Sequence, residues 1–167
     1  MILGSGNIAK VLEDRDDLVF FACGVSDSSC TDKAEFLREV ERLHSIDKES
    51  HVVYFSNLGV YRWDSPYIQH KRDMEEYVKS WFKYYTIVRV EVIRWGKNTN
   101  TIHNYFRKCI ENNIPVTIQN TNRYVLDIEE FKYWIGLIKY GVSGEMNIPG
   151  RKMHVCEIYK EVLEGRL

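Results

Sequence analysis

The stretch SPYIQHKRDMEEYVKSWF, residues 65–82, predicts the helix on which the fold assignment depends. Ser65 is a typical N-cap residue, and Pro66 is favoured in the first helical turn. Tyr67 and Lys71 are one helical turn apart, so their side chains project from the same face. Because a neighbouring ammonium favours the phenolate, we expect the pKa of Tyr67 to lie below its ordinary value. Such a tyrosine can act as general acid or base, although the same spacing also occurs in ordinary amphipathic helices.

The segment before this helix, HVVYFSNLGVY at residues 51–61, begins as a strand. Residues 51–55 form an apolar, β-branched and aromatic run, which is typical of a strand buried on both faces. Ser56 and Asn57 follow at its carboxyl end. In open parallel sheets this end faces the ligand-binding crevice, so we expect Ser56 or Asn57 to meet a ligand.

The first ten residues, MILGSGNIAK, contain a G-x-G-x-x-A pattern that opens a short helix. Such glycines let backbone amides approach a pyrophosphate at a helix N-terminus, although a plain tight turn has a similar composition. The residues that we expect in a cofactor-binding turn are Gly4, Ser5, Gly6, Asn7 and Ile8.

The glycine turn, the strand ending in serine and the Tyr-x-x-x-Lys helix, in this order, resemble the short-chain dehydrogenase/reductase superfamily, in particular its extended branch of nucleotide-sugar epimerases and dehydratases. The resemblance spans most of the 167 residues. It implies an α/β fold: a truncated Rossmann-like parallel sheet with flanking helices and a small C-terminal substrate-binding region. It also implies that Tyr67 is the acid/base, that Lys71 holds the nicotinamide ribose of NAD or NADP, and that Ser56 or Asn57 polarises the substrate oxygen.

The resemblance places the substrate region at about residues 91–167 of a single domain. YTIVRVEVIRWGKN resembles the strand and loop that begin this region, and we expect Asn98 in that loop to face the substrate. NRYVLDIEEF resembles an arginine-containing segment of the family, which places Arg123 near the phosphates of a nucleotide sugar. An arginine can grip a diphosphate bidentately, but a surface ion pair is as good an interpretation of Arg123.

The chain departs from the family between the glycine turn and the next strand. Family members usually have two more strands there, which carry the adenosine half of the cofactor site, whereas residues 11–17 allow only one or two helical turns. We therefore expect weak dinucleotide binding. A rival register makes residues 18–23 the second strand and Asp27 the ribose ligand. We disfavour it because the next strand already carries Ser56.

A second departure concerns the hydroxyl that polarises the substrate. Judged by its distance from the pair Val60 and Tyr61, the family position falls on Asn57, with Ser56 one residue early. An asparagine amide donates a hydrogen bond but cannot relay a proton as a hydroxyl can.

The remaining sequence alternates strands and helices, as in α/β proteins. We expect strands at residues 18–23, 86–90, 116–119, 124–126 and 145–148. We expect helices at residues 32–46, where Asp32 and Glu35 resemble a capping box, and at residues 100–112, 128–140 and 154–163. The loops at residues 96–99 and 120–122 are the expected substrate-facing ones.

Composition fits one domain, because 167 residues that are 44% hydrophobic can bury a sizeable core. A net charge of −1 with dispersed basic residues gives no electrostatic reason for nucleic-acid or membrane binding. No apolar run is long enough to span a bilayer, and the four cysteines, without C-x-x-C spacing, favour a reduced, cytoplasmic protein. The histidines lack zinc-like spacing, so we assign no metal, and we expect His70 on a solvent-facing or dimer-facing side.

The sequence thus predicts NAD(P)-dependent epimerase, dehydratase or reductase chemistry on a nucleotide-linked sugar. The alternative is a cofactor-free remnant that binds a nucleotide sugar or a partner chain, and the missing adenosine strands favour it. We also expect a homodimer in which helices 32–46 and 66–82 form a four-helix bundle. These helices carry more apolar residues than one sheet-facing stripe needs, namely Phe36, Leu37, Tyr77, Trp81 and Phe82.

Overall fold

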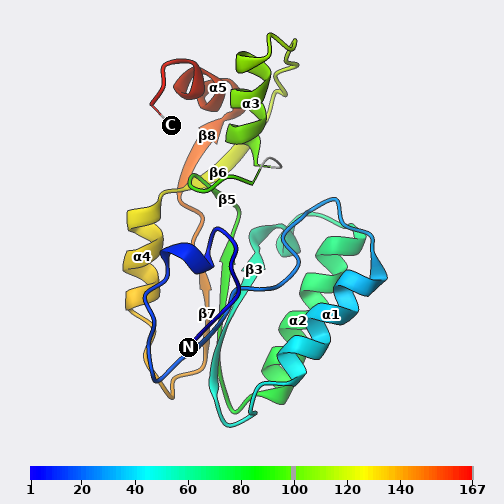
Figure 1. Cartoon of the computed structure of the whole chain (residues 1–167), viewed down its shortest axis with the longest axis vertical. Coiled ribbons are helices and arrows are strands. Elements are labelled where there is room, and N and C mark those ends of the chain that lie inside the picture. The colour runs from blue at the N-terminus through cyan, green and yellow to red at the C-terminus, as the bar shows by residue number, and fades with distance from the viewer. Residues whose placement is uncertain (99–100, 167) are drawn as a thin grey trace.

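The computed structural model describes residues 1–98 and 101–166. Its main body is a parallel sheet with helices on both faces, and a smaller region with its own strands and helices lies beyond one end of that sheet (Figure 1). The sheet has five strands in the order β1-β2-β3-β4-β7, and every neighbouring pair is parallel. These strands are β1 (Ile2–Leu3), β2 (Val19–Phe21), β3 (His51–Asn57), β4 (Tyr84–Val90) and β7 (Gly144–Asn147). The predicted Rossmann-like α/β class is therefore confirmed.

The strand order decides between the two registers. In the doubly wound order 3-2-1-4-5-6, the first strand pairs with the fourth. The rival register, in which β2 is the second strand, requires β4 to pair with β1, whereas β4 pairs with β3 over seven residues, from His51↔Tyr84 to Asn57↔Val90. The observed order matches a sheet whose second and third strands are missing, with β2 in the place of the fourth. Between β1 and β2 the chain forms one 3₁₀ turn, η1 (Ala9–Val11), and loops.

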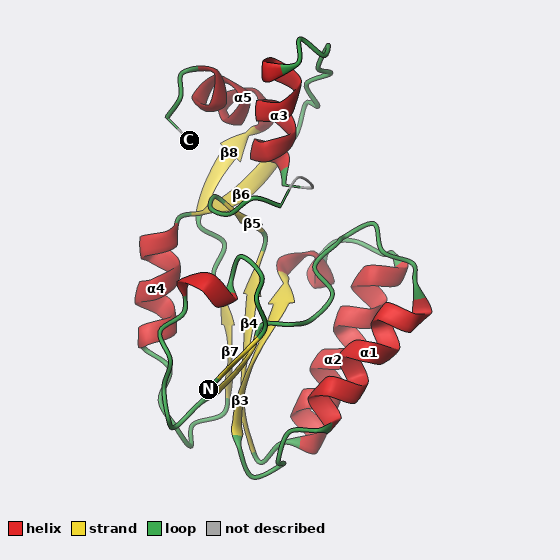
Figure 2. Ribbon diagram, viewed as in Figure 1, coloured by secondary structure: helices red, strands yellow, loops and turns green. Residues whose placement is uncertain are grey.

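Helices α1 (Lys33–His44) and α2 (Pro66–Trp81) cover one face of the sheet, and α4 (Ile128–Gly136) covers the other (Figure 2). α2 begins as predicted, because Ser65 Oγ accepts a hydrogen bond from Ile68 N at 3.2 Å and Pro66 opens the first turn. At α1 the Asp32 carboxylate accepts from Ala34 N at 2.8 Å.

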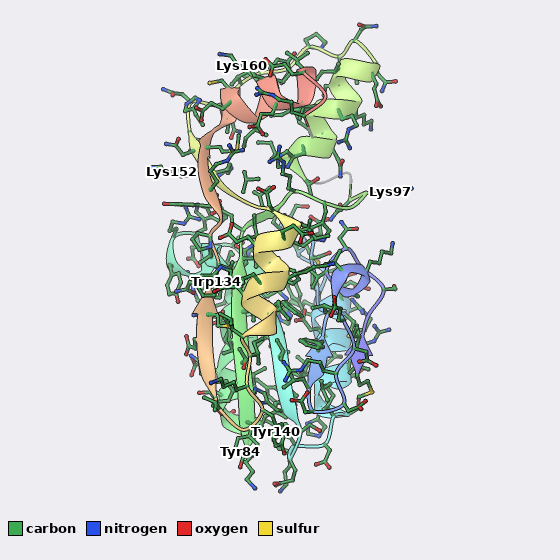
Figure 3. The ribbon with its side chains drawn as sticks, turned by 90° about the vertical axis from the view of Figure 1, so that its left-hand side faces the viewer. Tyr84, Lys97, Trp134, Tyr140, Lys152 and Lys160 are labelled. Carbon is green, nitrogen blue, oxygen red and sulfur yellow. The ribbon has the colours of Figure 1, made fainter. Side chains whose placement is uncertain are left out.

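Two core clusters hold these layers together. Under α1 and α2, buried side chains of the helices pack on buried side chains of the strands. The helices contribute Leu43, Met74 and Val78, and the strands contribute Val52, Tyr54 and Ile87. On the other face Phe131 of α4 packs on Phe55 with ring centroids 5.9 Å apart. Figure 3 shows α4 lying across this face, while Tyr84 and Tyr140 lie side by side at the end of the sheet far from the small region, with centroids 5.8 Å apart.

The small region has a three-stranded sheet, β5-β6-β8, in which β5 and β6 are parallel and β6 and β8 antiparallel. Its elements are β5 (Val92–Ile93), α3 (Ile102–Glu111), β6 (Asn122–Leu126), β8 (Arg151–His154) and α5 (Val155–Leu163). A separate core joins them, built on Phe106, Val125, Met153, Val155 and Ile158. Residues 91–167 do not all lie here, because α4 and β7 belong to the main body.

Some predicted elements are wrong. Residues 116–119 form no strand, because Val116 and Ile118 pack against the small core without a ladder partner. The helix predicted at residues 128–140 ends at Gly136. β5 and β8 were not predicted. Glu35 pairs with Arg38 at 2.7 Å and does not complete a capping box.

No helix of residues 1–98 and 101–166 has the length and apolar character that crossing a membrane requires.

His103 in α3 gives a prediction of pH-dependent stability. Its side chain is 2% exposed, and neither ring nitrogen has a hydrogen-bond partner among the described residues. Burial lowers the pKa of His103 from 6.5 to about 4, and the nearby Arg94 acts in the same direction. The unfolded chain therefore takes up a proton below pH 6.5 that the folded chain refuses until about pH 4.

We expect this residue alone to lower the free energy of unfolding by on the order of 2–3 kcal/mol as the pH falls across that window. In His103→Leu the loss should be smaller by that amount. Urea unfolding from pH 7 to pH 4 measures it. Equal slopes for the parent and His103→Leu would contradict the assignment.

Candidate functional site

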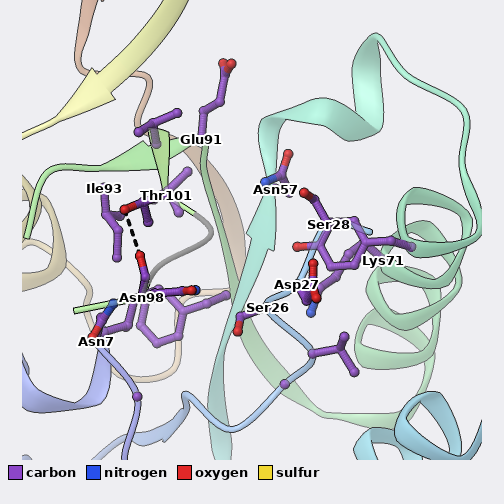
Figure 4. A pocket seen from close by; sticks show the side chains of 18 of the residues that line it. Asn7, Ser26, Asp27, Ser28, Asn57, Lys71, Glu91, Ile93, Asn98 and Thr101 are labelled. Atoms are coloured by element: carbon purple, nitrogen blue, oxygen red, sulfur yellow. Dashed lines mark hydrogen bonds between the residues drawn. The ribbon is translucent and has the colours of Figure 1, made fainter. Parts of the chain in front are cut away.

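A cavity of about 1390 Å³ opens at the carboxyl ends of the parallel strands and reaches the small region. Pockets that hold small ligands usually measure about 300–1,000 Å³, so this one has room for a dinucleotide or nucleotide and a second ligand. Figure 4 shows that its walls come from the glycine turn, the strand ends, α2 and the segment before α3. All the residues predicted for the site line this cavity: Gly4, Ser5, Gly6, Asn7, Ile8, Ser56, Asn57, Tyr67, Lys71, Asn98 and Arg123.

The glycine turn is held in place, yet it is open at one residue. Gly4 has a φ of 133°, and a Cβ there would lie 2.3 Å from the carbonyl oxygen of Ala22 in the neighbouring chain segment. Trp95 Nε1 donates to Asn7 O at 3.0 Å and fixes the other side of the turn. At Gly6 a Cβ would meet nothing within 4 Å. A ligand can therefore approach the backbone at Gly6, as the pyrophosphate of a dinucleotide requires.

Tyr67 is 5% exposed, packed among Val25, Ile68 and the partly buried Cys30. Its hydroxyl forms no hydrogen bond with the described residues. Burial raises the pKa of Tyr67 above its ordinary value, and the negative charges of Glu39 and Asp27 raise it further. The expected lowering by Lys71 is therefore wrong.

The reason lies in how Lys71 is held. Lys71 Nζ donates to Glu39 Oε1 at 3.0 Å and to Tyr54 OH at 3.0 Å, and it lies 5.8 Å from the centre of the Tyr67 ring. The buried Glu39 carboxylate thus balances the charge of Lys71. His70 also contacts Glu39, with its Nε2 3.1 Å from Oε2, so our expectation that His70 faces solvent or a dimer partner is wrong.

Glu39 is the site residue that the sequence analysis missed. A signal was present, since Phe36, Val40 and Leu43 mark the sheet-facing stripe of α1 and Glu39 lies within it. A carboxylate on such a stripe needs buried partners.

The two candidates at the end of β3 are engaged differently. Ser56 Oγ donates to Glu75 Oε1 at 2.5 Å, and Arg89 binds Glu75 through Nε at 2.8 Å, so the hydroxyl is part of a buried network. Asn57 Oδ1 accepts from Gly59 N at 2.6 Å. This bond fixes the amide, whose Nδ2 forms no hydrogen bond with the described residues. Figure 4 shows Asn57 beside the cavity.

Arg123 in β6 brings a guanidinium to the cavity from the small region. It is half-buried and lies 5.5 Å from the centre of the Trp63 ring. It forms no ion pair or hydrogen bond with any residue of the described ranges. The neighbouring Arg62 is instead paired with Glu91.

Two other residues considered in the sequence analysis, Asn98 and Asp27, form hydrogen bonds within their own loops. The main-chain oxygen of Asn98 accepts from Thr101 Oγ1 at 2.9 Å (Figure 4). Position 99, which we predicted in the same loop, lies outside the described residues. Asp27, the ribose ligand of the rival register, accepts from Ser29 N at 2.9 Å and from Ser29 Oγ at 2.7 Å.

No protein-family model matches this sequence, and no curated protein matches it either. Solved structures do share its fold. The enzyme WbmG of Bordetella bronchiseptica, in complex with NAD, has a TM-score of 0.69 and 14% identity over 90% of this chain and 56% of its own. A dTDP-4-dehydrorhamnose reductase of Bacillus anthracis, in complex with NADP, has a TM-score of 0.68 and 16% identity over 90% of this chain and 62% of its own. A UDP-galactose 4-epimerase has a TM-score of 0.62 and 15% identity over 90% of this chain and 62% of its own.

These similarities show that the chain shares the fold of these three enzymes, as the resemblance described above implies. The chain spans between 56% and 62% of the length of these three structures. At 14–16% identity they establish the architecture and leave the activity to be argued from the site.

The two glycines of the turn give a matched prediction. Gly4→Ala should lower the free energy of unfolding by on the order of 3 kcal/mol, because its backbone angle and its contact with Ala22 both exclude a Cβ. Gly6→Ala should change it by less than about 0.5 kcal/mol, because the space is open. Urea unfolding compares them, and equal destabilisation by both changes would show that the turn is not held as described.

Proposed function

We propose that this protein is an NAD(P)-dependent epimerase, dehydratase or reductase that acts on a nucleotide-linked sugar. One observation carries the proposal: a single cavity is lined by an open glycine turn, by Tyr67 and by Arg123, whose guanidinium has no ion-pair partner within residues 1–98 and 101–166. The structures with the same fold include complexes with NAD, with NAD and UDP, and with NADP.

The residues of the glycine turn fit a dinucleotide. The open backbone at Gly6 would receive the pyrophosphate, and Lys71 has one N–H beyond those bound to Glu39 and Tyr54 with which to hold a ribose hydroxyl. When bound, the nicotinamide supplies or accepts the hydride. Binding should be weak, because β1 is the last strand on its side of the sheet and no further strands of the described chain wall an adenosine.

Tyr67 and Asn57 would handle the reacting oxygen of the substrate. Asn57 Nδ2 would donate a hydrogen bond to that oxygen, with its amide fixed by Gly59. The amide cannot relay a proton, and the Ser56 hydroxyl is bound to Glu75, so proton transfer to or from the oxygen falls on Tyr67.

Arg123 would bind the diphosphate of the substrate. A half-buried guanidinium without an ion-pair partner attracts an anion, and its planar donors match phosphate oxygens. Asn98, at the edge of the same cavity, would contact the sugar.

A second candidate is a binding module that lacks turnover, for a nucleotide sugar or a partner chain. The observation that favours it is the Glu39–Lys71 ion pair, which leaves Tyr67 without an activating charge. The position of β1 at the edge of the sheet also favours it, because no further strand of the described chain walls an adenosine there.

Calorimetric titration with NAD and NADP tests the proposal. We expect binding in the millimolar range, lost in Gly6→Ala because the added methyl group blocks the backbone. UDP should bind independently, and Arg123→Met should remove this binding. Binding of UDP with no heat from either dinucleotide would favour the second candidate.

Tyr67→Phe tests the proton transfer. With a nucleotide sugar that the parent converts, we expect the rate to fall by about a hundredfold or more at unchanged dinucleotide affinity, because the ring still packs and only the hydroxyl is lost. Exposed Tyr133→Phe on α4 is the control. Full activity in Tyr67→Phe would refute the acid/base role.

We further propose a cytoplasmic homodimer formed through α1 and α2. Leu37 is 57% exposed and Trp81 39% exposed on these helices, whereas Phe82, which we expected at the interface, is 4% exposed and belongs to the core. Light scattering should give about twice 19.8 kDa for the parent, and a monomer for Leu37→Asp with Trp81→Glu. A monomeric parent would contradict this interface.

A further inference from the structure

Glu39 has no place in the mechanism proposed above, yet its carboxylate has four polar partners, among them Lys71, which lines the cavity. Its carboxylate is fully buried and accepts from Val25 N at 2.6 Å, Tyr54 OH at 2.7 Å and Lys71 Nζ at 3.0 Å. These partners come from the loop after β2, from β3 and from α2. A single carboxylate therefore ties together the elements that surround Tyr67.

The ion pair of Glu39 and Lys71 has no room to rearrange on the side of the loop after β2. A Cβ on Gly24 would lie 2.6 Å from Glu39 Oε1 and 3.1 Å from Lys71 Nζ. The backbone of Gly24 thus covers both charged groups, and the next residue, Val25, binds Glu39 and packs on Tyr67. Lys71 can turn toward Tyr67 only if it leaves Glu39 and this loop shifts.

The charges that face Tyr67 from each neighbouring element are Glu39 of α1, Asp27 of the loop after β2, and Lys71 of its own helix. Tyr54 of β3 adds a neutral hydroxyl, since burial and the nearby Glu39 raise its pKa. Burial opposes the charge on Glu39, but Lys71, His70, Tyr54 and Val25 together hold the pKa of Glu39 well below its usual range. The carboxylate is therefore ionised at neutral pH.

We propose that Glu39 is a positioning residue that holds the Lys71 ammonium against Tyr54 and cancels its charge, so that Tyr67 presents a neutral hydroxyl to the cavity. Removal of the carboxylate would release this constraint and expose Tyr67 to the full charge of Lys71. The arrangement of charges stands by itself, and only its consequence for turnover rests on the proposed function.

The test follows the titration of residue 67 in the protein without any ligand. A fluorinated tyrosine, whose phenol is more acidic than that of tyrosine, is incorporated at position 67 and its ¹⁹F resonance is recorded against pH. In Glu39→Gln we expect the midpoint to fall by about one pH unit or more, a tenfold or greater rise in phenolate at a given pH. Glu35→Gln, an exposed carboxylate on the same helix, should leave the midpoint unchanged.

A buried ion pair that loses one partner destabilises the fold by about 3–5 kcal/mol, whereas removal of both partners is often tolerated. The double variant Glu39→Gln with Lys71→Met therefore accompanies the single one and should titrate at the midpoint of the parent, because opposite charges are removed together. This comparison decides the question if the single variant does not fold.

An unchanged or raised midpoint in folded Glu39→Gln would overturn the proposal, and so would a large shift in the double variant. A lowered midpoint in Glu39→Gln supports it even when no substrate or dinucleotide binds. In that case the proposed function would fail while the role of Glu39 stands. If turnover is found, Glu39→Gln should also displace, in the same direction as the ¹⁹F midpoint, the limb of the pH profile that reports the ionisation of Tyr67.

Discussion

The parallel pairing of β3 with β4 is the constraint on which the rest of the structure depends. Its seven-residue register places Asn57 beside Val90, so both strands end at the same edge, and the glycine turn after β1 ends there too. The cavity is the consequence, because parallel strands deliver their following loops to one side. The pleat has a second effect: Tyr54 and Ser56 point to the face that α1 and α2 cover, where they meet buried carboxylates.

Two buried ion pairs occupy that face near the strand ends. Glu39 binds Lys71, and Glu75 binds Arg89, whose Nη2 also reaches Glu145 of β7 at 2.6 Å. A buried ion pair is weak grounds for high stability, because desolvation offsets much of the attraction. Its clearest effect is geometric, since each charge is satisfied in only one arrangement of helix and strand. The pairs thus join the orientation of α1 and α2 to the walls of the cavity, a link that apolar packing alone would leave looser.

The sequence predicted what local chemistry determines. Ser65 and Pro66 mark the start of α2, the apolar run of residues 51–55 marks β3, and the G-x-G-x-x-A pattern marks the turn at the cavity. Elements defined by distant pairing were missed, because β5 has two residues and acquires its identity only from β6. The prediction of a lowered pKa for Tyr67 was wrong for the same reason. Its neighbour along α2 was visible, whereas the opposing charge, Glu39, lies on another helix and 32 positions from Lys71.

The Tyr67 hydroxyl is the feature that separates a working site from a packed interior. Around it Lys71, Glu39, Tyr54 and Asp27 each form at least one hydrogen bond within the fold. Tyr67 alone among them lines the cavity without a hydrogen bond to the described chain. If its task were packing, the ring of a phenylalanine would suffice, and the hydroxyl would add only the cost of desolvation. Within residues 1–98 and 101–166 nothing binds this hydroxyl, so we expect its partner to be a group that enters the cavity. An oxygen of a bound ligand is one such group, because Tyr67 and Asn57 line the same cavity. The two candidate functions differ in whether a dinucleotide also binds and a proton then moves.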